Sequence, residues 1–324
     1  MIMIWPQPFP SLQGSGYLKI IIISGPTATG KTATALSVAR TFGAEIINAD
    51  SMQVYRYLDI GTAKPTREEQ QKVPHHLLDI VEPDDPYHAG RFQSDADVLI
   101  SDLGSRQKLP LIVGGTGLYI RSLLYGLCDL PEIQPEIRQQ VQNELEKDGV
   151  ESLYQHLKKV DPLVAGRLAP RDQVRIFRAL EVYLATGHSI DYFHEQHRFS
   201  RPKYSFLYLY LACERTILRQ RIADRVQQMM NHGFLAEIRN VLDKGYSPEL
   251  KSLQSTGYRQ LILHLQGVLS LDEALRLIVR DTRRYAKRQN TWFSRVPGIK
   301  IVNENERQYI PQLIHSFLAA EDCH

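Results

Sequence analysis

The chain has 324 residues, 43% of them hydrophobic, so it can bury a substantial core in one large domain or two smaller ones. No apolar run reaches the roughly 20 residues of a membrane-spanning helix, and no basic residue precedes the apolar residues at the start, which argues against a secretory signal. The cysteines, Cys128, Cys213 and Cys323, are too far apart for a disulfide framework or a zinc site, which indicates a reducing cytoplasm.

The formal net charge of +3 hides an uneven distribution along the chain. Residues 201–300 contain 18 Lys and Arg against 8 Asp and Glu, whereas residues 126–200 contain 9 against 12. A local excess of this size predicts a polyanionic partner, and an ordinary solvated basic surface is the alternative.

In chain order, the first strand is expected at Lys19–Ser24, a continuous apolar run typical of a strand buried on both faces. A glycine-rich loop follows it, and residues 32–42 then have helical spacing. Further strands are expected at Ala44–Asn48, Leu109–Val113, Phe206–Ala212 and Ile299–Val302. Helical patterns separate these strands, which predicts an α/β, P-loop NTPase-like three-layer fold with a mainly parallel sheet.

Between residues 126 and 200 the strand signals disappear and the pattern is polar and helical. This stretch is too long for a loop between two core strands, so it predicts an all-helical insertion domain. The expected organisation is a flexible N-terminal tail at 1–18, the first part of the core at 19–125, the insertion at 126–200, the second part of the core with a basic helix at 201–302, and a C-terminal helix or tail at 303–324.

The glycine-rich loop reads GPTATGKT, the pattern of a P-loop whose backbone N–H groups hold phosphate oxygens. Lys31 supplies a positive charge, and the Thr32 hydroxyl can ligate a Mg²⁺ ion that bridges the phosphates. The pattern alone does not identify the molecule that carries the phosphate. The residues expected to hold it are Gly25, Pro26, Thr27, Ala28, Thr29, Gly30, Lys31 and Thr32.

Asp50 directly follows the second strand, so its carboxylate should lie at the sheet edge beside the P-loop. A helix N-cap is an equally good interpretation of this residue. No convincing Walker B aspartate ends another apolar strand. The Leu109–Val113 strand leads instead into glycines and Thr116, which are suited either to a ligand contact or to a tight turn.

Basic residues recur at helical spacing in three places. Arg221 and Arg225 are four residues apart and could clamp a diphosphate, although a solvated face is common for such pairs. The insertion carries a strip made of Arg167, Arg171, Arg175 and Arg178. A later strip runs into Trp292 and Phe293, which predicts phosphate contacts beside rings that can stack on a base. This later strip consists of Arg276, Arg280, Arg283, Arg284, Lys287 and Arg288.

The pair His75-His76 could suggest a metal site. Adjacent residues seldom face one ligand, and no third Cys, His or carboxylate stands at a suitable spacing, so we interpret both histidines as structural.

Seven blocks in one order resemble the tRNA dimethylallyltransferases over about residues 19–293: GPTATGKT, INADSMQVYRYLDIGTAKP, VPHHLLDI, LPLIVGGTGLYIRSLLYGL, RALEVYLATG, STGYRQL and YAKRQNTWF. The resemblance implies transfer of a dimethylallyl group from dimethylallyl diphosphate to N6 of the adenosine 3′ of the anticodon. The implied products are N6-isopentenyladenosine and diphosphate, and the implied cofactor is Mg²⁺.

The resemblance also implies residue roles. The P-loop, Lys31, a Mg²⁺ ion on Thr32, and the pair Arg221 and Arg225 would hold the diphosphate leaving group, and Asp50 would accept the proton of the attacking amine. The insertion would bind the anticodon stem-loop. Apart from the resemblance, the later basic strip itself leads us to expect that Arg284 contacts tRNA. The other tRNA contacts implied by matching positions are Asp50, Ser51, Met52, Gln53, Thr116, Arg138, Val174, Arg175, Ile176, Phe177, Arg178, Gln254, Ser255, Thr256, Gly257, Tyr258 and Arg259.

Three alternatives are compatible with parts of the pattern. A nucleotide kinase would use the same loop to bind ATP. An adenylate isopentenyltransferase would prenylate free AMP, although a free nucleotide requires neither the insertion nor the basic strip. A non-enzymatic RNA-binding protein would retain the P-loop for structure only. We expect a cytoplasmic monomer with no membrane association and no obligate protein partner.

Overall fold

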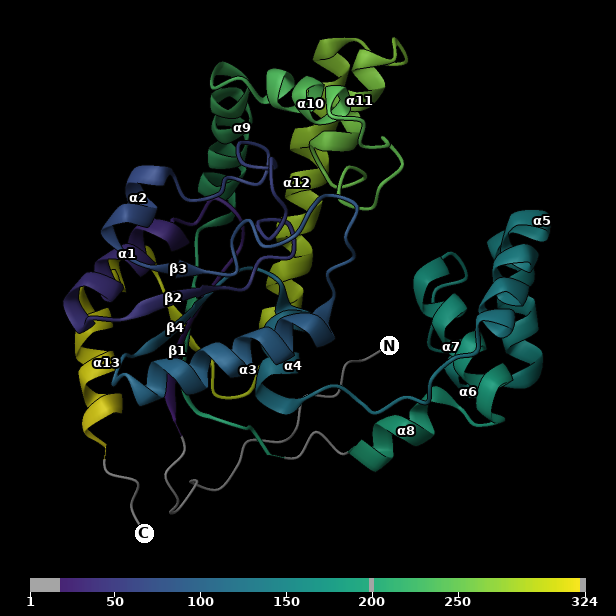
Figure 1. The fold of residues 1–324 in the computed structure, drawn as a ribbon, viewed down its shortest axis with the longest axis horizontal. Helices are drawn as coiled ribbons and strands as arrows, with labels where there is room; N and C mark the ends of the chain where they lie inside the picture. The colour runs from purple at the N-terminus through teal and green to yellow at the C-terminus, as the bar shows by residue number, and fades with distance from the viewer. Residues whose placement is uncertain (1–17, 198–200, 321–324) are drawn as a thin grey trace. The chain divides into compact units, whose positions relative to one another are not determined.

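The computed structural model describes residues 18–197 and 201–320 (Figure 1). The expected N-terminal tail at 1–18, apart from its last residue, lies outside these residues, as does Cys323. Within them the chain forms two compact units. One comprises residues 125–197 and 201, and the other comprises residues 18–124 and 202–320.

A six-stranded sheet forms the centre of the larger unit. Its strands are β1 (Lys19–Ser24), β2 (Glu45–Asn48), β3 (His75–His76), β4 (Pro110–Val113), β5 (Ser205–Leu211) and β6 (Lys300–Val302). They are ordered β3-β2-β4-β1-β5-β6, and every pairing is parallel. The α/β class and the parallel sheet predicted from the sequence are therefore confirmed, and among the strands of the described residues the sequence patterns missed β3 alone.

The strands are held in register by their apolar residues. Ile21 pairs with Leu111 on one side and with Leu207 on the other, which places β1 between β4 and β5. All four isoleucines of β1 are fully buried, because helices cover both faces of the sheet.

Helices on the two faces complete the three layers (Figure 1). α1 (Lys31–Phe42) and α13 (Ile310–Ala319) pack on the face that presents Ile21 and Ile23. α3 (Ala89–Ser105) contacts β2 and β4 and contributes the buried Phe92 to the opposite face. The remaining helical elements of this unit are α2 (Arg67–Lys72), α4 (Gly117–Tyr125), α9 (Arg215–Asn231), α10 (Phe234–Asp243), α11 (Tyr258–Leu265), α12 (Leu271–Phe293) and the 3₁₀ helix η1 (Glu304–Tyr309).

The smaller unit is helical, as expected for the insertion. It contains α5 (Pro135–Val160), α6 (Pro162–Ala165), α7 (Gln173–Thr186) and α8 (Ile190–His197). Leu153, Leu157, Ile176 and Leu180 form the centre of a core of its own. Gly149, with φ of 78°, interrupts α5 and allows the chain to turn back within it.

The two parts of the larger unit meet where the helical segment is inserted between them. The backbone N–H of Lys203 donates to the carbonyl oxygen of Leu124 at 2.7 Å, so the chain leaves and re-enters this unit at adjacent positions. No helix formed by the described residues is long and apolar enough to span a bilayer.

Candidate active site

The P-loop joins β1 to α1 and follows the outline that its sequence predicts. Gly30 precedes α1 with φ of 80° and provides no side-chain cap, so the first N–H groups of α1 remain available to an anion. Gly25 lies so close to β5 that a Cβ atom there would be 2.7 Å from the carbonyl oxygen of Leu211. The Thr29 hydroxyl donates to the carbonyl oxygen of Pro26 at 2.8 Å and closes the loop.

Lys31 folds back over the loop. Its Nζ donates to the carbonyl oxygens of Gly25 at 3.0 Å and Pro26 at 2.8 Å. Burial and the neighbouring Arg225 charge lower the pKa of Lys31 to about 8, while the Asp50 charge acts in the opposite direction. A bound anion would offset both unfavourable effects on the ammonium group.

The P-loop lines a cavity of about 390 Å³ together with Asp50 at the end of β2 and Arg225 on α9. Residues from the 51–53 turn, the 61–63 loop, the 255–258 segment and α12 complete its wall. Asp50, Lys31, Thr32 and Arg225, which lie far apart in sequence, therefore share one cavity.

Asp50 has one backbone partner in this cavity. Its Oδ1 accepts a hydrogen bond from the backbone N–H of Met52 at 2.9 Å. The next helix along the chain, α2, begins at Arg67 and is capped by Thr66, so the helix N-cap interpretation of Asp50 is wrong. Asp50 instead stabilises a tight turn that presents Ser51 to Gln53 to the cavity.

The predicted arginine pair is divided. Arg225 lines the cavity, and burial lowers its pKa against the raising effect of the Asp50 charge. Arg221 is not among the residues that line it. Its Nη2 forms an ion pair with Glu304 Oε1 of η1 at 2.7 Å. In this structure the pair therefore does not form the predicted clamp, because a carboxylate from the C-terminal segment binds one of its members.

Two further residues support the P-loop from distant parts of the chain. The amide of Gln289, on α12, accepts from the backbone N–H of Thr27 at 3.1 Å and donates to the carbonyl oxygen of Gly115 at 3.0 Å. Arg307, on η1, donates from Nη2 to the carbonyl oxygen of Thr29 at 2.8 Å. Sequence reasoning assigned neither residue a role.

The turn after β4 is tightly packed against the end of β2. A Cβ atom at Gly114 would lie 2.1 Å from the carbonyl oxygen of Ala49. The Thr116 hydroxyl accepts from the backbone N–H of Ser51 at 3.0 Å. The tight-turn interpretation of these glycines is confirmed. Thr116 positions the Asp50–Gln53 turn and is not among the residues that line the cavity, and its expected contact with tRNA stays a prediction.

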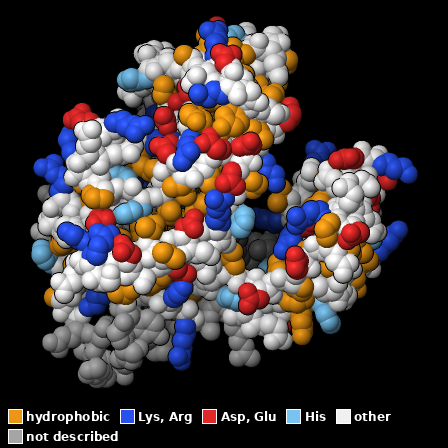
Figure 2. Space-filling model, viewed as in Figure 1, with side chains coloured by type: hydrophobic (Ala, Val, Ile, Leu, Met, Phe, Trp, Pro, Cys, Tyr) orange, Lys and Arg blue, Asp and Glu red, His pale blue; other side chains and the backbone are white. Residues whose placement is uncertain are grey.

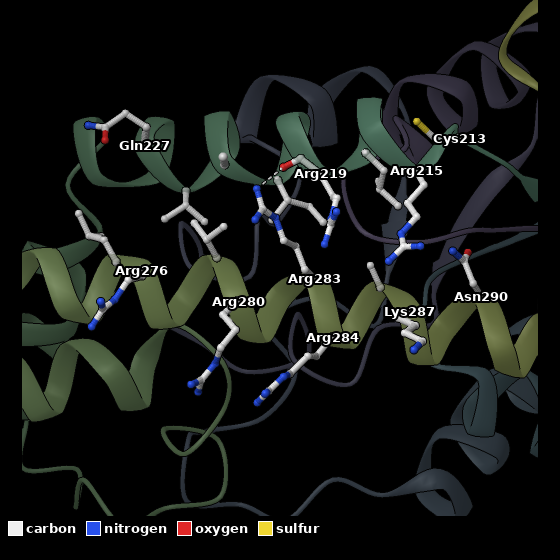
Figure 3. A pocket seen from close by; sticks show the side chains of 17 residues that line it. Cys213, Arg215, Arg219, Gln227, Arg276, Arg280, Arg283, Arg284, Lys287 and Asn290 are labelled. Carbon is white, nitrogen blue, oxygen red and sulfur yellow. Dashed lines mark hydrogen bonds between the residues drawn. The ribbon is translucent and has the colours of Figure 1, made fainter.

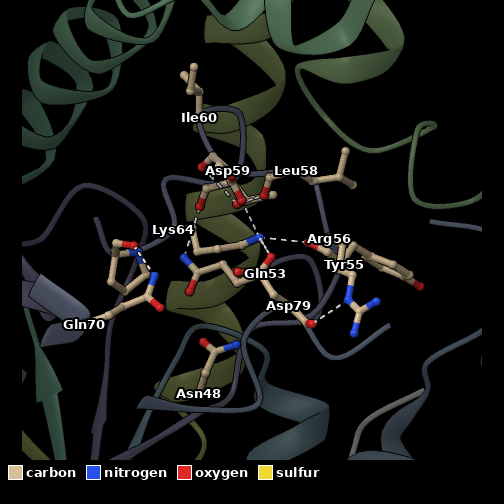
Figure 4. A network of polar contacts seen from close by, with 12 residues as sticks. Asn48, Gln53, Tyr55, Arg56, Leu58, Asp59, Ile60, Lys64, Gln70 and Asp79 are labelled. Carbon is tan, nitrogen blue, oxygen red and sulfur yellow. Dashed lines mark hydrogen bonds and ion pairs between the residues drawn. The ribbon is translucent and has the colours of Figure 1, made fainter. Parts of the chain in front are cut away.

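A buried lysine organises the 53–65 segment (Figure 4). Only 2% of the Lys64 side chain is exposed, and its Nζ binds Asp59 at 2.6 Å, Asp79 at 2.5 Å and the carbonyl oxygen of Tyr55 at 2.8 Å. The Gln53 amide donates to the backbone carbonyls of residues 62 and 63. These contacts fix the 53–65 segment, whose residues 61–63 line the cavity.

Glu237 on α10 connects this loop with the 254–259 segment. Its carboxylate accepts from three successive backbone N–H groups, those of Asp59, Ile60 and Gly61, at 2.6–3.1 Å. It also accepts from the hydroxyl of Tyr258 at 2.6 Å. Burial and the nearby Glu237 charge raise the pKa of Tyr258 well above its ordinary value.

The 254–259 segment combines structural and accessible residues. Tyr258 is 1% exposed, donates to Glu237 and lines the cavity, and its expected contact with tRNA stays a prediction. Gly257 is also buried, whereas Gln254, Thr256 and Arg259 are exposed. The Ser255 hydroxyl donates to the carbonyl oxygen of Ser252 at 2.8 Å.

A second, larger hollow lies between α9 and α12 (Figure 3). It measures about 860 Å³, and the described residues that line it include seven cations and no Asp or Glu. The cations are Arg215, Arg219, Arg276, Arg280, Arg283, Arg284 and Lys287. On the face shown in Figure 2, by contrast, Lys and Arg side chains lie interspersed with Asp and Glu. We call this hollow the α9–α12 groove.

The later basic strip shares one groove, as its helical spacing predicts, apart from Arg288. Five of its six cations line the α9–α12 groove, whereas Arg288 lies over the ring of Tyr285. Asp281 binds Arg280 at 2.9 Å and approaches Arg284 at 3.5 Å, and the Arg280 hydrogen bond lowers the pKa of this carboxyl. Phe293 is 1% exposed and packs between Tyr208 and Tyr210, so its predicted stacking on a base is wrong.

The expected tRNA contacts of the helical unit have mixed exposure. Arg138 and Arg178 both bind Glu181, which is only 3% exposed, at 2.7 Å and 3.2 Å. Val174 is 79% exposed, whereas Ile176 lies in the core of the unit and its side chain cannot contact tRNA. Arg175 pairs with Asp172 at 3.2 Å, and Phe177 is partly buried against the core.

Among the described residues, no group of three or more His, Cys, Asp or Glu side chains is placed to hold a metal ion. His76 binds Glu45 at 2.8 Å and His75 binds the carbonyl oxygen of Val73 at 2.8 Å, in agreement with their structural interpretation. Thr32 lines the cavity beside Asp50. One hydroxyl with few protein ligands suits Mg²⁺, which retains waters and takes phosphate oxygens as its other ligands.

Comparisons with known proteins match this architecture. Residues 53–296 match the family model described as IPP transferase. A tRNA dimethylallyltransferase of Syntrophobacter fumaroxidans is 49% identical over 86% of this chain and 82% of its own length, and one of Geobacter metallireducens is 49% identical over 86% and 90%.

Solved structures give the same result. A tRNA isopentenylpyrophosphate transferase of Bacillus halodurans superimposes with a TM-score of 0.69 and 36% identity, over 93% of this chain and 97% of that one. A eukaryotic dimethylallyltransferase described as acting on tRNA superimposes with a TM-score of 0.77 and 28% identity, over 92% of this chain and 77% of that one.

Proposed function

The chain belongs to the IPP transferase family, and we propose that it transfers the dimethylallyl group of dimethylallyl diphosphate to N6 of the adenosine 3′ of the tRNA anticodon. The products are N6-isopentenyladenosine and diphosphate. The enzyme is therefore an alkyl transferase acting on tRNA, and we expect it to work in the cytoplasm.

The observation that carries this proposal is the shared cavity of the P-loop, Arg225 and Asp50. The cations and N–H groups would hold the diphosphate, and the carboxylate would face the nucleophile. Such a site supports displacement of a diphosphate by an amine, because it provides for both the leaving charge and the departing proton.

In the reaction, the bond between the allylic C1 and the diphosphate oxygen breaks while a bond forms between C1 and N6. Lys31, Arg225 and the first N–H groups of α1 stabilise the negative charge on the leaving diphosphate. Asp50 accepts the N6 proton, and its hydrogen bond to Met52 orients the carboxylate toward the cavity. A Mg²⁺ ion on Thr32, when bound, supplies further charge neutralisation at the diphosphate.

The basic surfaces favour tRNA over free AMP as the acceptor. The α9–α12 groove and the exposed arginines of the helical unit offer far more cationic surface than one mononucleotide could contact. We assign the phosphodiester backbone of the anticodon stem-loop to these surfaces.

A nucleotide kinase is less consistent with the sheet. β4 and β5 flank the P-loop strand β1, and the residues that directly follow them are Gly114 and Ala212. A Walker B aspartate for the Mg²⁺ of ATP would be expected at the end of such a strand.

The test is incubation of the purified chain with unmodified tRNA, with AMP and with a small-molecule phosphate acceptor, each in the presence of dimethylallyl diphosphate or ATP. We expect prenylated adenosine in tRNA only with dimethylallyl diphosphate. Prenylation of AMP but not of tRNA would identify an adenylate isopentenyltransferase, and phosphorylation from ATP would identify a kinase.

A further inference from the structure

The ion pair between Arg221 and Glu304 lies beside the diphosphate end of the candidate site. Glu304 begins η1, and Arg307 of the same short helix donates to the carbonyl oxygen of Thr29 in the P-loop. This bond anchors η1 to the loop. A Cβ atom at Gly30 would lie 3.2 Å from Arg307 Nη1, which also shows how closely the two segments approach.

Arg221 lies on α9 and contacts η1 through its ion pair with Glu304. It is one helical turn before Arg225, whose side chain lines the cavity. Side chains four residues apart on a helix are neighbours, with Cβ atoms roughly 5–6 Å apart. Arg221 therefore lies next to the cavity, although its guanidinium is directed to Glu304 at 2.7 Å and lies near the Cys213 sulfur at 3.8 Å.

The pair is only partly protected from solvent. The side chain of Arg221 is 37% exposed and that of Glu304 is 47% exposed, so their mutual attraction is weak. A diphosphate carries more negative charge than a carboxylate and accepts bidentate hydrogen bonds from guanidinium groups, so it can compete for Arg221. The Glu304 carboxylate, left beside that diphosphate, would repel it.

We propose that Glu304 holds Arg221 in a resting position, and that a diphosphate bound in the P-loop takes Arg221 from it. Glu304 is then a positioning residue that lowers the affinity of the site for diphosphate, including the diphosphate product. This inference rests on the proposed function, because it takes the P-loop ligand to be a diphosphate.

Arg307 has a related role in this arrangement. Its Nε is buried without a hydrogen-bond partner, and its Nη2 already holds the P-loop. Because Arg307 also acts on Glu304 electrostatically, it can stabilise the carboxylate after Arg221 has left. When Arg221 exchanges Glu304 for the diphosphate, Arg221 therefore gains a new counter-charge, and Glu304 keeps one in Arg307.

The test measures binding of inorganic pyrophosphate, with Mg²⁺ and without tRNA, to the full chain and to the variants Glu304→Gln, Arg221→Ala and the double variant. We expect Glu304→Gln to tighten binding about two- to fivefold, the size expected when a half-exposed ion pair is lost. Arg221→Ala should weaken binding, and in the double variant the gain from Glu304→Gln should be smaller, because only the direct repulsion between Glu304 and the diphosphate is then removed. A purely structural role for Glu304 would not produce tighter binding.

Glu306→Gln is the matched control. It removes the same charge from η1. Glu306 accepts a hydrogen bond from the backbone N–H of Asn303 at 2.8 Å, and the side-chain oxygen of a glutamine can still accept it. We expect its pyrophosphate affinity to equal that of the unaltered chain. The proposal would be overturned by weaker or unchanged binding in Glu304→Gln, by an equal gain in the Arg221→Ala background, or by an equal gain in Glu306→Gln.

Prenyl transfer by the same preparations is assayed separately. If the pyrophosphate affinities follow the expected order but no preparation transfers a prenyl group, the proposed function is contradicted and the exchange of Arg221 between Glu304 and diphosphate still holds. If prenyl transfer is normal but the affinities follow a different order, only the proposed exchange of Arg221 is contradicted.

Discussion

At the scale of single residues, the candidate site brings two cations, Lys31 and Arg225, close to one carboxylate, Asp50. Lys31 is held by two loop carbonyls, its pKa is lowered by burial and by Arg225, and the Asp50 carboxylate faces the same cavity. An anion bound between Lys31 and Arg225 would complete this set, because the two cations would then face a partner instead of one another.

Asp50 is the residue whose loss should separate chemistry from binding. We expect Asp50→Asn to reduce the rate of prenyl transfer about 10²- to 10⁴-fold, because the amide cannot accept the N6 proton. Binding of tRNA should be largely retained, because the asparagine oxygen can still accept from Met52. Single-turnover transfer and tRNA binding measured on one preparation test this, and an undiminished transfer rate would remove Asp50 from the role of base.

The sequence identified those site residues that belong to local patterns. The segment Gly25 to Thr32 directly follows β1, and Asp50 lies two residues after β2, so their places could be predicted from short segments. Gln289 and Arg307 could not be predicted, because they reach the P-loop across 262 and 278 positions of chain. Glu304 was missed for the same reason, and with it the partner that binds Arg221.

At the scale of elements, strands with apolar runs were predictable and the edge of the sheet was not. β3 has only His75 and His76, whose side chains carry no apolar signal, and it forms because β2 offers it backbone partners. Phe293 shows the opposite error. Its position after the basic strip suggested exposure, but the packing of α12 on β5 buries it.

Glu45 of β2 should make the stability of the sheet edge depend on pH. Hydrogen bonds from Arg106 and His76 lower its pKa, and its side chain is only 10% exposed. A carboxyl with a lowered folded-state pKa contributes stability above its unfolded pKa, near 4.5, and loses it as the pH falls through the folded value.

We therefore expect Glu45→Gln to lower the free energy of unfolding by about 1–3 kcal/mol at pH 5, since it weakens charged hydrogen bonds. The difference from the unaltered chain should shrink by pH 3. Denaturant unfolding at both pH values measures it, with Glu68→Gln on the exposed face of α2 as the control. A difference that grows toward pH 3 would contradict the assignment.

The cations of the α9–α12 groove should make the affinity for tRNA depend on the salt concentration. We expect Arg284→Ala to weaken tRNA binding and to reduce the slope of log affinity against log salt by about one, because one phosphate contact is lost. Arg239→Ala, on α10 outside the residues that line the groove, is the control. Titrations at several salt concentrations measure the slope, and an unchanged slope for Arg284→Ala would exclude a phosphate contact there.

At the scale of the whole molecule, the helical unit is a separable insertion. It has a core of its own, and the chain leaves and re-enters the α/β unit at residues joined by the Lys203–Leu124 hydrogen bond. Its composition predicted helices, and the end points of the insertion could be approximated because strand signals stop and resume there.

We expect a variant with residues 126–200 replaced by a short Gly-Ser linker to fold and to bind inorganic pyrophosphate as the full chain does. Its affinity for tRNA should fall at least about tenfold, as several phosphate contacts are removed together. Calorimetric titration with each ligand measures both. Loss of pyrophosphate binding in a folded variant would show that the α/β unit cannot form its diphosphate site alone, and unchanged tRNA affinity would remove the helical unit from tRNA recognition.

The position of β5 has a consequence for synthesis of the protein. β1 pairs on one side with β5, whose first residue leaves the ribosome roughly 180 residues after β1 ends, about 10–40 s later at ordinary elongation rates. During that interval the edge of Lys19–Ser24, with its four isoleucines, has no strand beside it on the β5 side. The nascent chain therefore carries a strand edge with unpaired backbone N–H and C=O groups while the entire helical unit emerges, and this edge can pair with another chain until β5 arrives.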